Sequence, residues 1–404
     1  MTLTYLSLKP EQPIRTGGIK IGGGYLDTQD YLPGSVVRGA LAEWLKLQGL
    51  ESQIRDTVSR LRFGNFFPST DAQLWSLPFP TTAVECKLHG GFKTSPGSEG
   101  HGIRDTLLAA VAYSELIKSG ARFPVPFLLR CLEAKHRDQP EICYGRLERV
   151  AGYYIRRDGR YSQIRPEEVL QTKVALSRHR RAAREAMLYR VVALAPGLRG
   201  EGTPLYFVGR IWTQEPSLID RLCQAVSEVG VGGLTTRGFG RVTCSTATIA
   251  VKPLAQRLRD FNAKLASAWQ ELAELANQCG AAVSSSPHGS YFSVDLLSPA
   301  HLTDGDGLPT LRLVLSYQGR DLEPIWWSAQ SAYLGGFSTA WGLPKPSALG
   351  VAAGSTYVYR VDGNPEDLVS WLENLEHQGV GLRTDEGLGE VLICHPFHEE
   401  VEPV

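Results

Sequence analysis

Several short signatures of metal and nucleotide sites are missing from this sequence. Its seven cysteines are spread widely over 404 residues and form no Cys-x-x-Cys pair. An odd number of scattered cysteines fits free thiols in a reducing compartment, so we predict no bound metal ion and no cofactor. No Gly-Lys-Ser or Gly-Lys-Thr tripeptide occurs either, which excludes a Walker phosphate-binding loop.

Net charge and long apolar runs are also absent. The 42 basic residues balance 42 acidic ones, which argues against a globally cationic nucleic-acid coat but leaves room for a local basic groove. No apolar run approaches the ~20 residues that span a bilayer, and the first residues do not follow the order of a signal peptide. We therefore expect a soluble cytoplasmic protein without a membrane segment, whose length and 43% hydrophobic content suit two or three domains.

The chain does contain a long-period repeat. Residues 230–242 and 379–391 align without a gap and share seven of thirteen residues, four of them glycine. Pro216 and Pro365 open a helical pattern at the same distance before each copy, and β-rich runs flank the copies at 205–213, 241–249, 356–361 and 390–397. The order strand, helix, glycine-rich loop, strand therefore occurs twice, which indicates an internal duplication.

The two copies of the loop differ in charge. Paired glycines let a backbone turn at positive φ and approach a ligand, and successive N–H groups can then form an anion site. The first copy adds Thr235, Thr236, Arg237 and Arg241, whereas the second adds Asp385, Glu386 and Glu390. We predict that the first loop contacts phosphate or nucleic acid and that the second is structural or faces protein. Two tight turns in a duplicated sheet remain the alternative, and a dinucleotide site is excluded because the loop follows a helix and precedes a strand.

Three further segments have clear secondary-structure patterns. Residues 2–8 alternate polar and apolar, as a half-buried strand does. Ser35 is a candidate cap for a helix in whose first turn Arg38 opposes the helix dipole, so either a nearby anion or a solvated arginine is predicted. A stripe from Leu254 to Leu275 follows Pro253, and we favour one packed helix between the two halves over a coiled coil.

The densest basic stretch lies at 172–190. Its cations are Lys173, Arg178, Arg180, Arg181 and Arg184, with a single acid, Glu185. Because the stretch lies between two β-like segments, we predict that it forms the tip of a β-hairpin. Arginine forks suit phosphate groups, and a solvated charged surface is the alternative.

Several motifs together resemble one protein family. They are the Leu-Pro-Gly-Ser-Val-Val-Arg-Gly-Ala-Leu run that ends at Leu41, the glycine-rich loops, the Pro-x-Pro, Cys-Lys and Asp-Thr-Leu succession in 76–107, and the Gly-Leu-Pro-Lys-Pro and Gly-Ser-x-Tyr succession in 331–361. The chain thereby resembles the RAMP superfamily of CRISPR-associated proteins, and within it the Csx-ten family RAMP subunit of type III-D effector complexes. That subunit is Cas-five-like and caps the 5′ end of the guide RNA.

The resemblance implies an α+β fold of two ferredoxin-like (RRM-like) domains with an inserted β-hairpin thumb, each ending in a glycine-rich loop. The expected division is an N-terminal domain at 1–250 with insertions at about 65–200, a connecting helix at 251–283 and a C-terminal domain at 284–404. The implied function is a non-catalytic subunit that holds the 5′ repeat handle of CRISPR RNA in antiviral defence. Its implied partners are the RAMP backbone subunits, the large polymerase-like subunit and, indirectly, target RNA.

The resemblance and the charge pattern together give a set of expected RNA contacts. These residues are Lys20, Arg38, Lys87, Lys93, Lys173, Arg178, His179, Arg180, Arg181, Arg184, Gly232, Gly233, Thr235, Thr236, Arg237, Gly238, Phe239, Gly240, Arg241, Trp341 and Lys345. Trp341 is predicted to stack on RNA, and a place in the core is the equal alternative. Many members of the family carry a Cys-x-x-Cys-Gly segment, of which Cys143-Tyr-Gly145 remains here. The resemblance thus implies a lost zinc ribbon, with Cys131 and Cys143 as ligands kept as the alternative.

The alternative function is a RAMP-family endoribonuclease that processes guide RNA or cuts target RNA. Its candidate catalytic residues are Asp27, Asp30 and His89, with His101 as a second histidine. General acid–base chemistry requires groups within hydrogen-bond reach of the reacting atoms, and a loop aspartate before a helix is often a cap. We therefore expect the non-catalytic role.

Overall fold

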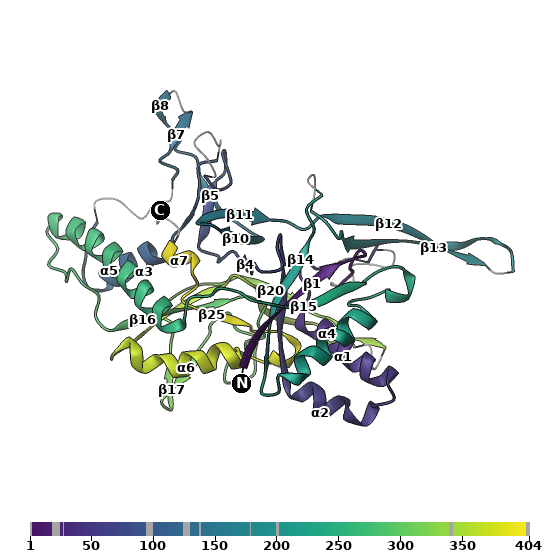
Figure 1. Ribbon diagram of the computed structural model, residues 1–404. Helices are drawn as coiled ribbons and strands as arrows, with labels where there is room; N and C mark the ends of the chain where they lie inside the picture. Colours follow the sequence, from purple (N-terminus) through teal and green to yellow (C-terminus); the bar gives the residue numbers. More distant parts are fainter. Residues whose placement is uncertain are drawn as a thin grey trace.

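Two four-stranded antiparallel sheets form the body of the protein (Figure 1). The computed structural model describes residues 2–17, 25–26, 28–93, 100–123, 130–136, 139–177, 179–198, 202–338 and 342–400. Within these ranges, no helix is both long enough and apolar enough to cross a membrane.

The first sheet has the order β15-β1-β14-β3. Its strands are β1 (Thr2–Pro10), β3 (Leu61–Ser69), β14 (Tyr206–Thr213) and β15 (Val242–Ala247). Helix α1 (Gly34–Leu47) leads from β1 towards β3, and α4 (Ser217–Val229) connects β14 to β15. The strands predicted at 2–8, 205–213 and 241–249 and the helix that follows Pro216 are thereby confirmed.

The core of this half lies between the sheet and its two helices. Leu41 and Leu45 of α1 and Leu222 of α4 are buried together with Leu6 and Phe207 of the sheet. The spacing of the apolar residues in α1 places them on one face, as expected for an amphipathic helix. The two helices therefore cover a single face of the sheet, and Figure 1 shows them side by side.

The start of α1 differs from the prediction. The helix begins at Gly34 after Pro33, and Ser35 makes no capping hydrogen bond. Instead the Gly34 N–H donates to Oδ1 of Asn65 on β3, at 3.1 Å. A Cβ atom at Gly34 would lie 2.6 Å from the carbonyl oxygen of Gly64, so glycine lets the helix start directly against the strand. The predicted Ser35 cap is wrong because β3 supplies the acceptor.

The second sheet repeats the strand order as β19-β24-β16-β25. Its strands are β16 (Ser290–Leu296), β19 (Trp326–Ser328), β24 (Thr356–Val361) and β25 (Val391–Ile393), and α6 (Pro365–Gln378) connects β24 to β25. The predicted strand at 356–361 and the helix at Pro365 are confirmed. The strand predicted at 390–397 is shorter, since β25 ends at Ile393 and helix α7 (Phe397–Glu400) follows.

The connection from β16 to β19 lacks a helix. It contains the small hairpin β17 (Leu315–Tyr317) and β18 (Arg320–Leu322). Helix α5 (Leu254–Gln278), which precedes β16, packs on this sheet instead and buries Leu258, Phe261 and Leu265 in its core. The interpretation of this stripe as one helix packed against the protein's own core is confirmed.

A long insertion separates β3 from β14. Its elements are β4 (Leu77–Pro78), β5 (Ala83–Cys86), β6 (Ile103–Asp105), α3 (Leu107–Lys118), β7 (Ala134–His136), β8 (Gln139–Ile142), β9 (Leu147–Arg149), β10 (Tyr153–Arg157), β11 (Arg160–Ile164), β12 (Glu168–Ser177) and β13 (Ala182–Leu194). In Figure 1 the β7–β8 hairpin and the long β12–β13 hairpin project from different ends of the body. Helix α3 packs against α5 and contributes Leu107, Leu108 and Val111 to the core of the second half.

Short elements complete the described chain. They are β2 (Tyr25–Leu26), α2 (Ile54–Ser59), β20 (Ser331–Leu334), β21 (Phe337–Ser338), β22 (Leu343–Pro344), β23 (Ala348–Val351) and the one-turn helices η1 (Glu51–Gln53), η2 (Thr235–Arg237) and η3 (Thr384–Glu386). Strand β2 pairs with β13 in parallel, so the segment before α1 is attached to the base of the long hairpin.

Candidate nucleic-acid interface

The first glycine-rich loop is a tight turn held by its own backbone. Gly230 ends α4 at φ 80°, and Gly238 and Gly240 have φ values of 85° and 79°. The Val231 N–H donates to the Gly240 carbonyl at 2.8 Å, and the Gly240 N–H donates to the Pro13 carbonyl at 2.9 Å. A Cβ atom at Gly240 would collide with the Val231 carbonyl oxygen, so the turn requires glycine there.

The backbone of this loop differs from an open anion site. In addition to Val231 and Gly240, the Gly233 N–H donates to the Arg15 carbonyl at 2.8 Å and the Arg237 N–H donates to the Leu234 carbonyl at 2.8 Å. The prediction of a row of free N–H groups is therefore wrong for these residues, because main-chain carbonyls already accept from them. The groups that this loop presents to solvent are instead the exposed side chains of Thr235, Thr236 and Arg237.

The base of the long hairpin lies against this loop. Strands β12 and β13 pair as predicted for a hairpin, with Lys173 opposite Tyr189 and Gln171 opposite Val191. Val191 and Ala193 pack on Phe239 of the loop. Arg237 donates to the Tyr189 hydroxyl at 3.1 Å, and Lys173 Nζ lies 5.2 Å from the centre of the Phe239 ring. The loop and the hairpin base thus form one surface that carries Lys173 and Arg237.

Phe239 itself does not face solvent. Its side chain is 1% exposed, so the ring supports Lys173 by a cation–π contact and by packing. The ring of Phe239 is therefore not part of the surface, and the contact of this residue with RNA stays a prediction. Arg241 is exposed at the other edge of the loop, where it pairs with Glu11 at 2.9 Å; such an exposed pair holds its partners only weakly.

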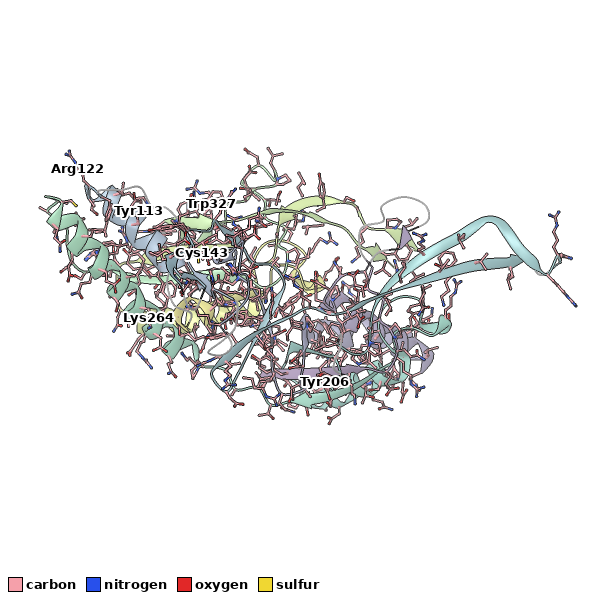
Figure 2. All side chains as sticks on the ribbon, turned by 90° about the horizontal axis from the view of Figure 1, so that it is seen from above. Tyr113, Arg122, Cys143, Tyr206, Lys264 and Trp327 are labelled. Atoms are coloured by element: carbon pink, nitrogen blue, oxygen red, sulfur yellow. The ribbon has the colours of Figure 1, made fainter. Side chains whose placement is uncertain are left out.

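The tip of the hairpin extends far from the body, as Figure 2 shows from above. His179, Arg180 and Arg181 are exposed there, and Arg181 adopts φ 50° in the turn. Arg178 lies outside the described residues. Arg184 lies on β13. The predicted hairpin with a basic tip is confirmed as a structure, and RNA binding by it stays a prediction.

The hairpin has a second, apolar face. Because side chains alternate along a strand, Leu170, Val174 and Leu188 lie on the opposite face from Lys173 and Tyr189. Leu170, Val174, Leu176 and Leu188 are 56%, 45%, 68% and 63% exposed. One face therefore places Lys173 beside the glycine-rich loop, and the other exposes Leu170, Val174 and Leu188 together with the Thr172–Arg190 pair.

The second glycine-rich loop repeats the backbone of the first. Gly379, Gly387 and Gly389 have φ values of 71°, 88° and 64°. The Val380 N–H donates to the Gly389 carbonyl at 2.9 Å, and the Gly389 N–H donates to the Pro299 carbonyl at 2.9 Å. These bonds match those of Val231, Gly240 and Pro13, so the duplication extends to the hydrogen bonds of the turn.

The C-terminal end of the second loop is buried against the first half of the protein. Glu390 is 1% exposed and accepts hydrogen bonds from Arg210 Nε at 2.8 Å and from the Asn65 backbone at 2.7 Å. Burial lowers the pKa of Arg210, but Glu390 outweighs this effect and raises it overall. The prediction that this loop faces protein is confirmed, and the protein surface that it faces is β3 and β14.

Two predicted RNA contacts are engaged by the same loop. Arg38 pairs with Asp385 at 2.8 Å, which supplies the anion expected near the start of α1. Lys345 pairs with Glu386 at 2.7 Å. Burial raises the pKa of Glu386, but hydrogen bonds from Arg383 and Lys345 outweigh it and lower the pKa overall. Trp341 lies outside the described residues, as does Lys20.

Lys87 and Lys93 lie in the insertion. Lys87 lines an open cavity of about 700 Å³ between the insertion and the second half, together with Arg146, Arg149 and Trp326. Lys93 forms an ion pair with Glu133 at 2.6 Å, and Arg104 pairs with the same carboxylate. The described cations among the predicted RNA contacts therefore lie in three places. Some are on the hairpin and the first loop, some are beside the second loop, and some are in this insertion.

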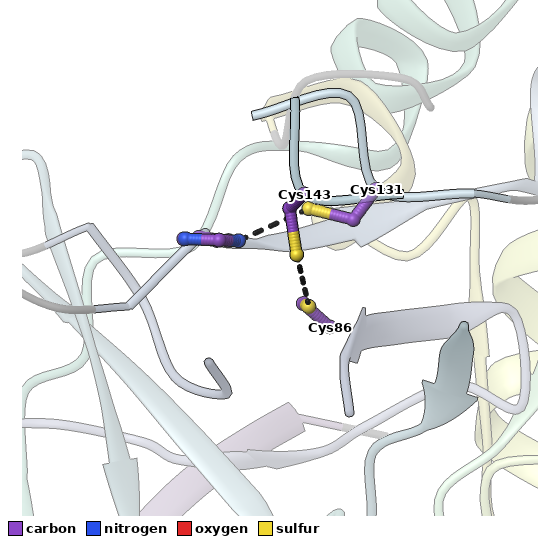
Figure 3. A group of neighbouring side chains, drawn as sticks. Cys86, Cys131 and Cys143 are labelled. Carbon is purple, nitrogen blue, oxygen red and sulfur yellow. Dashed lines mark hydrogen bonds between the residues drawn. The ribbon is translucent and has the colours of Figure 1, made fainter. Parts of the chain in front are cut away.

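The insertion also brings four metal-ligand side chains together. The donor atoms of Cys86, His101, Cys131 and Cys143 all lie within 4.8 Å of one another, and Figure 3 shows the three sulfur atoms converging. Cys86 Sγ lies 3.8 Å from Cys143 Sγ, and His101 Nδ1 lies 3.1 Å from Cys131 Sγ. The sequence analysis keeps Cys131 and Cys143 as alternative ligands but does not join Cys86 and His101 to them, because the four residues come from separate segments without a Cys-x-x-Cys pair.

The candidate catalytic residues have structural partners. Asp30 accepts a hydrogen bond from the Tyr153 hydroxyl at 3.0 Å, and burial raises the pKa of its carboxyl group. The His89 ring stacks on the His101 ring with 4.3 Å between centroids, beside the cysteine cluster. Asp27 lies outside the described residues. Asp30 and His89 therefore lie in different surroundings, Asp30 beside Tyr153 and His89 beside the cysteine cluster.

A buried histidine was not identified from the sequence. His398 Nδ1 lies 2.9 Å from Asp105 and its Nε2 lies 2.9 Å from Asp295. Burial lowers the pKa of His398, but the two carboxylates outweigh it and raise the pKa to about 10. The cluster joins the insertion, β16 and α7, and its signal in the sequence is limited to a His-Pro-Phe-His run with no spacing that points to the aspartates.

Comparison with known proteins gives a family and distant structural likenesses. Residues 11–243 match the sequence model of the RAMP superfamily. The chain is similar to a chain of the type III-B Cmr-beta complex bound to cognate target RNA, with 12% identity, a TM-score of 0.37, and coverage of 92% of this chain and 89% of that one. It is also similar to a chain of the Csm3–Csm4 subcomplex of the type III-A CRISPR-Cas interference complex, with 13% identity, a TM-score of 0.33, and coverage of 90% and 95%. No curated protein matches the sequence.

Proposed function

The chain belongs to the RAMP superfamily, and from this we propose that it is a non-catalytic RNA-binding subunit of a type III CRISPR interference complex. The finer part of the proposal is a Csx-ten-like subunit of a type III-D complex that holds the 5′ repeat handle of CRISPR RNA. Its partners would be the backbone subunits and the large polymerase-like subunit, with target RNA contacted through the guide.

The observation that carries this proposal is the joined surface of the first loop and the hairpin base. Arg237 reaches Tyr189 across the two elements, and Lys173 lies over Phe239. Both elements fall within the residues that match the superfamily. Cations fixed on a turn and along a strand hold a phosphate backbone in register without reading bases.

The strand order supports the proposed domain description. The order β15-β1-β14-β3, with α1 and α4 as connections, suits a ferredoxin-like domain at 1–250 that carries the insertions. The second sheet has the corresponding order and suits a second such domain at 284–404 with α5 as the connecting helix. In this proposal the second domain differs from the first in one connection. It has no helix between β16 and β19, and α5, which precedes β16, packs on its sheet instead.

The two faces of the hairpin suggest two kinds of partner. The face with Lys173 and Tyr189 meets the glycine-rich loop and suits RNA. The face with Leu170, Val174 and Leu188 exposes aliphatic side chains around Arg190, and it suits a neighbouring protein subunit because exposed aliphatic patches mark interaction surfaces. A hairpin that contacts RNA on one side and protein on the other would fix the guide within the assembly.

The test is salt-dependent binding of a labelled CRISPR repeat-handle RNA. A variant with Lys173→Ala, Arg180→Ala and Arg181→Ala should bind more weakly, and its salt dependence should flatten by about 0.7 per lost phosphate contact. A matched control removes three exposed cations of the second half, Arg259, Lys264 and Arg320. Equal losses in both variants would contradict the hairpin assignment.

RNA cleavage is scored in the same reactions. Intact RNA after prolonged incubation with and without divalent cations is the expected result. Cut RNA would favour the endoribonuclease alternative, and Asp27→Asn, Asp30→Asn and His89→Ala would then be compared to locate the active residue.

A further inference from the structure

The insertion contains an arrangement that the proposed RNA-binding function does not use. Cys86 ends β5, His101 precedes β6, and Cys131 and Cys143 flank the β7–β8 hairpin. Cys86, His101 and Cys131 are buried and Cys143 is partly buried. From this geometry we propose that Cys86, His101, Cys131 and Cys143 bind one zinc ion that fixes the β7–β8 hairpin to the body of the protein.

The distances fit tetrahedral coordination. Zinc–sulfur bonds of about 2.3 Å at tetrahedral angles place two sulfur atoms about 3.8 Å apart. Cys86 Sγ and Cys143 Sγ are 3.8 Å apart, too far for a disulfide, whose sulfurs are ~2.05 Å apart. All four donor atoms lie within 4.8 Å of one another, and a cavity of about 10 Å³ is lined by Cys86, His101 and Cys131.

The donor set selects the class of metal. Three thiolates and one imidazole are soft and borderline ligands, which favour zinc over magnesium, calcium or manganese. A closed set of four protein ligands is typical of structural zinc sites, whereas catalytic zinc keeps a position for water. Binding removes the thiol protons of the three cysteines to solvent, so the centre would carry a net charge of −1.

The backbone around the sulfur atoms is shaped for this set. Tyr144 adopts φ 49°, and a Cβ atom at Gly145 would lie 2.9 Å from Cys86 Sγ and 3.1 Å from Cys143 Sγ. Glycine at 145 therefore lets the chain pass directly beside two of the ligands.

Hydrogen bonds connect the four ligand segments to one another. The Cys131 N–H donates to the Gly145 carbonyl at 3.0 Å, and the Tyr144 N–H donates to the Cys131 carbonyl at 2.9 Å. The Lys87 N–H donates to the Arg146 carbonyl at 3.0 Å, and the His101 N–H donates to the His89 carbonyl at 3.0 Å. A metal ion bound by all four segments would close several chain loops at once, and cross-links of this kind stabilise the fold through loop-closure entropy.

Metal content of the full-length protein is the first measurement. Protein purified without added metal should contain one zinc ion per chain by elemental analysis, and Cys131→Ser or Cys143→Ser should reduce this to background. The matched control is the double variant Cys223→Ser and Cys244→Ser, whose sulfur atoms lie 3.3 Å apart outside this cluster. That variant removes two thiols and should keep its zinc.

A second variant guards against simple unfolding. His101→Cys preserves four ligands and should retain one metal ion. After exchange of zinc for cobalt, the wild type should show the visible bands of tetrahedral cobalt and a thiolate charge-transfer band, which should strengthen in His101→Cys because a fourth thiolate is added. Folding of every variant is checked by circular dichroism.

Three results of the metal analysis would overturn the proposal, and a fourth would come from mass spectrometry. They are a wild-type protein without stoichiometric metal, iron in place of zinc, and a folded Cys131→Ser variant that keeps its zinc. A Cys86–Cys143 disulfide in the metal-free native protein, detected by mass spectrometry without reduction, would replace the zinc site with a redox pair. RNA binding is measured separately, because failure of the zinc site leaves the surface with Lys173 and Arg237 untouched.

Discussion

The two glycine-rich loops share one backbone and differ in what surrounds it. Each ends a helix with a glycine at positive φ, contains a one-turn helix and returns through two further glycines. The first presents Thr235, Thr236 and Arg237 to solvent, whereas the second buries Glu390 against Arg210 and Asn65. Duplication therefore preserved the turn, and substitution of a few side chains gave one copy an outer surface and the other an internal contact.

The largest effect is expected from removing the buried carboxylate of the second loop. Glu390→Gln leaves Arg210, whose side chain is 3% exposed, as an unpaired buried charge. We expect the free energy of unfolding to fall by about 3–5 kcal/mol, measured by urea denaturation. The control is Asp385→Asn, which removes the exposed partner of Arg38 and should cost less than about 1 kcal/mol. Equal effects would show that the two contacts of the loop carry similar weight.

His398, which follows the second loop, gives the protein a pH-dependent contribution to stability. His398 follows β25, and its pKa is raised to about 10 when folded, above about 6.5 in an unfolded chain. Its contribution to stability is therefore complete below about pH 6.5 and is lost as the pH rises through about 10. We expect the wild type to lose a few kcal/mol more than His398→Gln between about pH 7 and about pH 10.

Urea titrations of both proteins across this range measure the effect. His288→Gln is the control, since His288 lies in the loop before β16 and is exposed; it should follow the wild-type curve. Parallel curves for wild type and His398→Gln would mean that Asp105 and Asp295 do not raise the pKa of His398 in the folded protein.

Alanine at the last glycine of each loop tests whether the shared backbone is equally demanding. Gly240 and Gly389 have positive φ, and an added Cβ atom would collide with the carbonyl oxygens of Val231 and Val380 respectively. Both Gly240→Ala and Gly389→Ala should lower the unfolding free energy by similar amounts, about 1–3 kcal/mol, seen as matched shifts in thermal midpoint. Gly238→Ala meets no atom within 4 Å and should show only the smaller backbone term of ~1–2 kcal/mol. A loop that tolerates alanine would break the equivalence.

The smallest effect is expected from single arginines on the two loops. Arg237 of the first loop is exposed, and its counterpart position in the second is occupied by Glu386, which pairs with Arg383 at 2.6 Å. Arg237→Ala should flatten the salt dependence of handle-RNA binding by roughly 0.7 to 1. Arg383→Ala should leave RNA binding unchanged. If both variants bind like wild type, the loop surface does not meet phosphate.

Local glycine and proline chemistry made much of the fold predictable. The repeat at 230–242 and 379–391 located both loops, and Pro216 and Pro365 located the starts of α4 and α6, because these residues restrict the backbone wherever they occur. Residues 172–190 were recognisable as a hairpin because a charged turn lay between β-like runs. The charge difference between the loops also predicted that the second faces protein.

Contacts between distant segments could not be predicted in the same way. Asn65 replaces Ser35 as the cap of α1, and Glu390 pairs with Arg210, because the tertiary fold supplies partners that no local spacing indicates. Cys86 and His101 were not recognised as neighbours of Cys131 and Cys143 for the same reason. Sequence reasoning expected anion binding by the loop backbone, but the carbonyls of Pro13 and Arg15 accept those N–H groups, and both lie far away in the chain.

The place of α3 has a consequence for synthesis of the protein. This helix leaves the ribosome early, yet Leu107, Leu108 and Val111 find their partners in α5 and β16, which are translated much later. At roughly 5–20 residues per second, its apolar face waits on the order of ten seconds or more before the second core can close. The nascent chain exposes the apolar face of α3 throughout that interval. Chaperones that bind emerging apolar segments are therefore expected to bind it.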